Sequence, residues 1–293
     1  MNAPAPNGTN MGSHPPLVKI CGVRSVAAAR AAAGAGTDLL GFNFAPMSRR
    51  RIDPAVANEA IEAARREAPS PLGPQGSRRQ RGDHEGERGN GGPPQTLLPE
   101  VTGNRGPRLP SPLVVAPLST GTPGLGERGP AIAGIFVNQP LAEVAGISRE
   151  HRLDYLQLSG HETPEYCRAL AEETGLPVIK AVRLARSDEA ALLEAYTRDG
   201  GVTLLLADAA VSGAWGGSGQ PWDWHTAAGL ATRTRLLLAG GLTPQNVASA
   251  IAAVQPFGVD VASRVETDGQ TDPDKVRAFI KSVKSIPIVP LSP

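Results

Sequence analysis

The chain has 293 residues, of which 40% are hydrophobic and 19% are charged, and its formal net charge is +1. This balance excludes the strongly basic surface of nucleic-acid-binding proteins, and aromatic residues, at 4%, are too few for a platform that stacks single-stranded bases. No stretch approaches the roughly 18 apolar residues of a membrane-spanning helix. We therefore expect a globular protein with no nucleic-acid or membrane partner.

Two cysteines, Cys21 and Cys167, are too few for a disulfide framework or a cysteine-rich zinc site. They favour a reducing cytoplasm, and we expect neither a metal nor a cofactor. Cys167 lies within a helical pattern and is expected to pack as a small hydrophobic residue.

Composition distinguishes the segments expected to fold as a domain from those expected to be disordered. Residues 67–130 contain 13 Gly and 12 Pro in 64 residues, which predicts a disordered insert because few apolar side chains could offset the entropy of ordering it. Residues 1–16 lack the features of a signal peptide and are interpreted as a disordered tail, like 287–293. Residues 17–66 and 131–286 are expected to form one domain.

Eight short apolar runs rich in Val, Ile and Leu follow one another along this domain, and a segment with helical features follows each of them. The runs lie at residues 17–22, 39–44, 131–137, 155–160, 177–182, 202–208, 235–241 and 258–263. A cap residue followed by proline marks four expected helix starts. These are Asp53-Pro54, Thr163-Pro164, Thr243-Pro244 and Asp272-Pro273.

Eight strands, each followed by a helix, predict a parallel sheet covered by helices, and eight units favour a closed (β/α)₈ TIM barrel over an open sheet. The insert then falls between the second helix and the third strand, on the face opposite the loops that carry chemistry.

Reactive residues of such barrels lie at the carboxyl ends of the strands. The polar and glycine residues at these positions are Cys21, Asn43, Arg49, Arg50, Arg51, Asn138, Gln157, Ser159, Arg183, Asp208, Gly240, Gly241, Ser263 and Arg264.

Alternation along the first strand places Lys19 and Cys21 on one face, where the charge of Lys19 would favour a thiolate. A small buried cysteine that only packs is the alternative, and Asp208 could equally be a turn or helix cap. The glycine clusters at 215–220 and 238–246 favour a phosphorylated small molecule, since glycine lets backbone N–H groups approach an anion closely.

Several strings, in order, resemble the phosphoribosylanthranilate isomerases of tryptophan biosynthesis. They are VKICGVRS (18–25), GFNFAPMSRRRI (41–52), IFVNQ (135–139), LQLSG (156–160), IKAV (179–182), GGSGQPWDW (216–224), LAGGLTPQNV (238–247) and GVDVASRVE (258–266). The likeness covers residues 17–284 except the insert. It implies an isomerase that acts on a phosphorylated substrate, as a monomer or homodimer.

The resemblance also implies roles for single residues. Cys21 would be the general base and Asp208 the general acid of an Amadori rearrangement. Arg50 would hold the anthranilate carboxylate through its planar guanidinium group. Further contacts with the substrate or its phosphate are expected from Gln157, Gly217, Gly219, Gly240, Gly241 and Ser263.

Two positions depart from the family pattern. Ser159 stands where a histidine is usual, with His161 two residues later, and we interpret His161 as a surface residue. Arg264 replaces a glycine; it would either strain the backbone, if its φ is positive, or add a cation near the phosphate.

Two alternatives remain. A histidine-pathway barrel isomerase would need aspartates at the ends of the first and fifth strands, where Cys21 and Val182-Arg183 stand. A non-catalytic or impaired phosphate-binding barrel, whose insert recruits a partner, is the second alternative.

Overall fold

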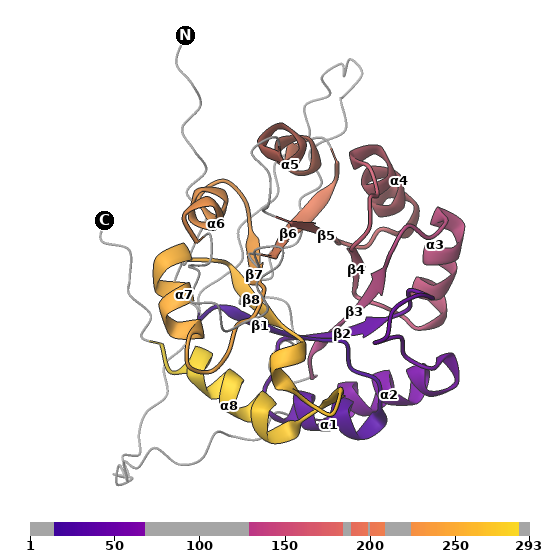
Figure 1. Cartoon of the computed structure of the whole chain (residues 1–293). Helices are drawn as coiled ribbons and strands as arrows, with labels where there is room; N and C mark the ends of the chain where they lie inside the picture. Colours follow the sequence, from indigo (N-terminus) through magenta and orange to yellow (C-terminus); the bar gives the residue numbers. More distant parts are fainter. Residues whose placement is uncertain (1–14, 68–128, 184–188, 199, 209–223, 287–293) are drawn as a thin grey trace, which may run out of the picture.

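Eight parallel strands form a closed barrel in which neighbours in sequence are neighbours in space, and helices surround it (Figure 1). The computed structural model describes residues 15–67, 129–183, 189–198, 200–208 and 224–286. The predicted (β/α)₈ barrel is therefore confirmed.

The elements alternate along the chain as predicted. The strands are β1 (Leu17–Cys21), β2 (Leu39–Asn43), β3 (Ala131–Phe136), β4 (Tyr155–Leu158), β5 (Val178–Arg183), β6 (Val202–Asp208), β7 (Leu236–Ala239) and β8 (Gly258–Val261). The helices are α1 (Val26–Gly34), α2 (Pro54–Arg66), α3 (Leu141–Glu150), α4 (Pro164–Thr174), α5 (Glu189–Arg198), α6 (Trp224–Ala231), α7 (Val247–Val254) and α8 (Pro273–Lys284).

Three of the four predicted caps start helices where expected. The Asp53 carboxylate accepts a hydrogen bond from the backbone N–H of Ala55, and the hydroxyl of Thr163 and the carboxylate of Asp272 cap α4 and α8 in the same way. Each cap satisfies an N–H group that has no partner within its helix.

The prediction that a helix starts at Thr243-Pro244 is wrong by three residues. Helix α7 begins at Val247, and the residues before it form a turn. In this turn the Asn246 side chain accepts a hydrogen bond from the backbone N–H of Thr243 at 2.7 Å, and the Thr243 carbonyl accepts from the N–H of Val247. The polar side chains thus hold a tight turn after β7 instead of a longer helix.

Two apolar layers hold the barrel together. The larger lies between the strands and the helices, and residues such as Leu156, Leu205 and Phe279 are fully buried in it. The smaller fills the interior of the barrel, with Leu39, Ile179 and other residues. Because side chains alternate along a strand, strands such as β4 and β7 supply both layers.

The segment between α2 and β3 leaves and rejoins the barrel at one place. Glu67 follows the last turn of α2, and a β-carbon on Gly129 would lie 2.8 Å from the carbonyl oxygen of Ala64 in that same turn. The two ends therefore lie together at the amino-terminal side of the strands. The predicted insert, apart from residues 67, 129 and 130, lies outside the described residues, as do 1–14 and 287–293 of the predicted tails.

A short antiparallel hairpin after β8 was not expected from the sequence. A 3₁₀ turn (η1, Ser263–Val265) leads into β9 (Glu266–Thr267), which pairs with β10 (Gln270–Thr271) just before α8. In the part of the chain that the structure describes, no helix combines the length and the apolar character needed to cross a membrane.

Candidate active site

The end of β1 carries the candidate base above a buried ion pair. Val18 and Ile20 pack outward, so Lys19 and Cys21 face the interior of the barrel. Lys19 is fully buried, and its Nζ lies 2.6 Å from Oδ1 of Asp260, its direct pairing partner on β8. Cys21, one layer higher, is only partly buried and stands at the carboxyl-terminal mouth of the barrel.

The surroundings of Cys21 favour the protonated form of its thiol. Burial raises its pKa to about 11 and outweighs the attraction and hydrogen bond from Lys19 and the charge of Arg50, which lower it. The nearby Asp260 carboxylate adds to the rise. Lys19 therefore lowers the pKa of Cys21, as predicted, but burial and Asp260 raise it by more, so the net shift is upward.

Alkylation kinetics should report this protonated thiol. In a Cys167→Ala background, the rate of Cys21 carboxamidomethylation by iodoacetamide should rise roughly tenfold per pH unit from pH 7 to about pH 10, because only the thiolate reacts. A rate that levels off near pH 8 would contradict the raised pKa. Free cysteine, measured in parallel, provides the ordinary profile.

Asp208, the candidate acid, is the last residue of β6. Leu204 and Leu206 belong to the interior layer, so alternation directs Asp208 inward at the same mouth as Cys21. Asp208 is partly buried and is level with Ala239 on β7, directly before the glycine turn. The structure thus directs both candidate residues into the same end of the barrel.

Arg50 lies beside Cys21 and is held by a carboxylate that the sequence reasoning did not single out. Its Nε donates to Oε1 of Glu266 at 2.6 Å and its Nη2 donates to Oε2 at 3.0 Å. These hydrogen bonds hold the pKa of Glu266 below its usual range. The aliphatic part of Arg50 crosses over Gly22, where a β-carbon would lie only 2.5 Å from Cδ of Arg50. Gly22 also has a φ of +80°, so glycine is required there for two reasons.

The candidate phosphate residues follow neighbouring strands. Gly240 and Gly241, after β7, have φ values of +96° and +60°, which glycine adopts without strain. Ser263 and Arg264 are exposed in the turn after β8. Because β7 pairs with β8, both loops lie at one side of the mouth.

Arg264 does not strain the backbone. Among the described residues, the non-glycine residues with positive φ are Asn138, Arg152, Gln255 and Asp268. The strain alternative for Arg264 is therefore wrong, and an added cation is what the substitution provides. Gly217 and Gly219 lie outside the described residues.

Gln157 faces the interior from β4 and is almost fully buried. Its Nε2 donates to the hydroxyl of Ser159 at 3.1 Å, whereas its Oε1 has no hydrogen-bond partner within the described part of the chain. His161 is exposed, as predicted.

A second buried ion pair lies on β5, where Nζ of Lys180 donates to Oε2 of Glu162 at 2.8 Å. Glu162 also accepts a hydrogen bond from the backbone N–H of Asn138, which ties the loops after β3 and β4 together.

Asp260, one layer below Cys21, and Glu266, beside Arg50, are residues of this region that the sequence reasoning missed. A signal for Asp260 was present, because it alternates with valines on β8 and so faces inward at the level of Lys19. Nothing in the local pattern of Glu266 indicated its partner, which is 216 residues away. Within the described ranges, no cluster of three or more His, Cys, Asp or Glu side chains could hold a metal ion.

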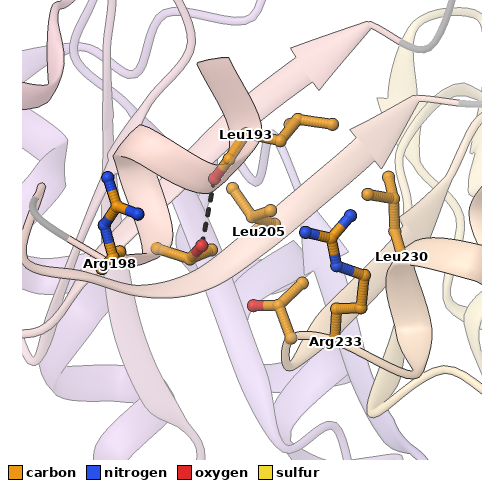
Figure 2. A pocket seen from close by; sticks show the side chains of 7 residues that line it. Leu193, Arg198, Leu205, Leu230 and Arg233 are labelled. Atoms are coloured by element: carbon orange, nitrogen blue, oxygen red, sulfur yellow. Dashed lines mark hydrogen bonds between the residues drawn. The ribbon is translucent and has the colours of Figure 1, made fainter. Parts of the chain in front are cut away.

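A separate pocket of about 290 Å³ lies outside the barrel wall, between α5 and α6 (Figure 2). Leu205 of β6 forms its floor, and Arg198 and Arg233 lie at its sides. None of the candidate site residues lines this pocket, so it is not the site described above.

Comparison of the chain with known proteins agrees with this architecture. The family model described as N-(5′-phosphoribosyl)anthranilate (PRA) isomerase matches residues 122–282, more than half of the chain. An N-(5′-phosphoribosyl)anthranilate isomerase from Roseiflexus castenholzii is 38% identical over 92% of this chain and 98% of its own length. The chain belongs to the N-(5′-phosphoribosyl)anthranilate isomerase family.

Solved structures of this family share its fold. The phosphoribosyl anthranilate isomerase of Thermus thermophilus is 30% identical, with a TM-score of 0.57 over 92% of this chain and all of that one. Another, in complex with reduced 1-(o-carboxyphenylamino)-1-deoxyribulose 5-phosphate, is 27% identical, with a TM-score of 0.58 over 92% of this chain and 98% of that one. The chain is thus an isomerase with the (β/α)₈ fold of its family.

Proposed function

We propose that the chain converts N-(5′-phosphoribosyl)anthranilate to 1-(2-carboxyphenylamino)-1-deoxyribulose 5-phosphate, with Cys21 as general base and Asp208 as general acid. One observation carries the proposal. A thiol and a carboxyl group, both partly accessible, point into the same end of the barrel from the ends of β1 and β6. The family membership and the ligand of the related complex support this substrate, and the related multifunctional tryptophan biosynthesis proteins support a role in that pathway.

The first step is acid catalysis. Asp208 donates its proton to the oxygen of the furanose ring as the bond from C1′ to that oxygen breaks, and the nitrogen lone pair forms an iminium ion. The ring opens without an external reactant.

The second step is base catalysis. The thiolate of Cys21 removes the proton from C2′. The resulting enolamine takes up a proton at C1′ and loses its C2′ hydroxyl proton to the Asp208 carboxylate, so the ketone forms and the acid is restored. A thiol with a pKa of about 11 is a poor source of thiolate in the empty site. The iminium ion changes this, because a positive charge close to the sulfur favours the ionised form, and the thiol proton passes to solvent at the open mouth. Ring opening thus prepares the base for its own step.

Two anion-binding regions orient the substrate between these groups. Arg50 binds the anthranilate carboxylate beside Cys21, and the backbone N–H groups of Gly240 and Gly241 bind the phosphate with Ser263 and Arg264. Gln157 offers a substrate hydroxyl its Oε1, which has no hydrogen-bond partner among the described residues. Gly217 and Gly219 are assigned to the phosphate by the family resemblance.

The direct test follows the loss of fluorescence as phosphoribosylanthranilate is consumed by the purified full chain. Turnover, together with rescue of a tryptophan auxotroph that lacks this isomerase, would support the proposal. Binding of the reduced product analogue without turnover would instead support an impaired or non-catalytic barrel. The unstrained backbone at Arg264 removes one reason for that alternative.

Deletion of residues 68–128 should leave catalysis intact. The flanking residues Glu67 and Gly129 meet at the last turn of α2, on the side of the barrel opposite the candidate site, so a direct join needs little rearrangement. We expect kcat/KM in the fluorescence assay to stay within about threefold of the full chain. A loss of more than roughly tenfold, with an unchanged melting temperature, would show that the segment contributes to the site.

A further inference from the structure

We infer that Glu266 is a positioning residue that selects substrates bearing an aryl carboxylate, by fixing which edge of the Arg50 guanidinium faces the mouth. This inference rests on the proposed role of Arg50. It begins from the geometry of the pair, in which the two carboxylate oxygens of Glu266 meet Nε and Nη2 of Arg50 at 2.6 and 3.0 Å.

A guanidinium group has two edges that can each bind a carboxylate with two parallel hydrogen bonds. Glu266 occupies the edge formed by Nε and Nη2. The other edge, formed by Nη1 and the second hydrogen of Nη2, has no hydrogen bond to any described residue. Arg50 can therefore accept a second carboxylate without releasing the first.

Arg50 needs such an anchor because it lies in the loop between β2 and α2, on a long side chain with many rotamers. The loop holds its backbone through a hydrogen bond from the N–H of Arg50 to the hydroxyl of Ser48. Gly22 provides the surface over which the aliphatic part lies. Neither contact sets the rotation of the guanidinium plane, whereas two hydrogen bonds to Glu266 do.

Glu266 is itself fixed on the hairpin after β8. Its carbonyl accepts from Nζ of Lys275 at 2.8 Å, and β9 pairs with β10 through Glu266 and Thr271. The side chain is 11% exposed, compared with 20% for Arg50. The hairpin therefore presents a rigid carboxylate, and the ordering of Arg50 takes place before the substrate arrives.

We therefore expect Glu266 to affect the preference for carboxylated ligands over ligands without a carboxylate, and not the affinity for all ligands alike. An oriented guanidinium favours a ligand with a carboxylate next to the amine, and it has no effect on the same ligand without that group. The residues proposed to bind the phosphate, in the loops after β7 and β8, do not include Arg50, so the phosphate is expected to contribute equally to both ligands.

Two probes separate these contributions. Calorimetry would measure the dissociation constants of reduced 1-(o-carboxyphenylamino)-1-deoxyribulose 5-phosphate and of its analogue without the carboxyl group. Glu266→Gln should reduce the preference for the carboxylated probe by roughly tenfold, as expected for groups coupled in one hydrogen-bond network, and should leave the other probe within about twofold. Glu266→Asp, which keeps the charge but is shorter, should fall between.

The controls distinguish three outcomes. Glu173→Gln, at an exposed ion pair with Arg149, should change neither probe. Equal weakening of both probes by Glu266→Gln, or no change in either, would overturn the role of Glu266. If Arg50→Ala abolishes the preference but Glu266→Gln does not, only the positioning role fails. If Arg50→Ala leaves the preference intact, the proposed carboxylate site itself is wrong.

Discussion

Cys21→Ser and Asp208→Asn should each lower kcat by roughly 10²- to 10⁴-fold, the usual contribution of a positioned acid or base. Serine retains the size of the side chain, but its hydroxyl ionises far less readily than a thiol. Asparagine retains the shape of the carboxyl group, but it has no acidic proton to give. Each substitution therefore removes one proton transfer and leaves the substrate contacts in place.

Binding and kinetics together make this test specific. The reduced product analogue should bind both variants with a dissociation constant within about threefold of the parent, because Arg50 and the glycine turn after β7 are unchanged. The matched control is Cys167→Ala, since Cys167 is fully buried in α4 and has no proposed role in the reaction. It should retain kcat within about twofold. Near-parental kcat in either active-site variant would refute the corresponding role.

Lys19→Met should lower the free energy of unfolding by about 3–5 kcal/mol, because it leaves the Asp260 carboxylate without its cation. Lys19 is fully buried and Asp260 nearly so, which makes the remaining charge costly. A loss of this size is a large part of the total stability of a typical domain. The midpoint of urea unfolding should fall by roughly 1–2 M, given a slope of about 3 kcal/mol per M.

A second variant separates the ion pair from the volume of the lysine. Lys19→Met combined with Asp260→Leu removes both charges and should be more stable than Lys19→Met alone. Lys284→Met provides the more accessible comparison, because Lys284 and Asp38, which lie 2.7 Å apart, are both partly exposed, and its loss should cost at most about 1 kcal/mol. If the free energy of unfolding of Lys19→Met lies within about 0.5 kcal/mol of the parent value, the buried ion pair does not contribute to stability as expected.

The same substitution should also lower the reactivity of the Cys21 thiol. Lys19 is the main group that lowers the pKa of the Cys21 thiol, so its removal should raise that pKa further. The alkylation rate of Cys21 at pH 8 should then fall below that of the parent. The effect on folding and the effect on the thiol have one cause and can be measured independently.

The sequence by itself determined the order of elements and the positions of the strand ends. Apolar runs, helix caps and side-chain alternation are local properties, so they placed Cys21 and Asp208 at the ends of their strands, and Lys19 on the same face as Cys21, without any knowledge of distant residues. The local signal failed at Thr243, because a threonine and proline also suit the tight turn that Asn246 closes before α7.

Only the tertiary structure decided which charges meet. Closure of β8 onto β1 joins Lys19 to Asp260 across 241 residues, and the hairpin after β8 joins Arg50 to Glu266 across 216. Both pairings depend on the register and on the return of the chain, which no short window contains. Burial then decides the state of the thiol, because the cost of desolvating Cys21 exceeds the attraction of the lysine beside it.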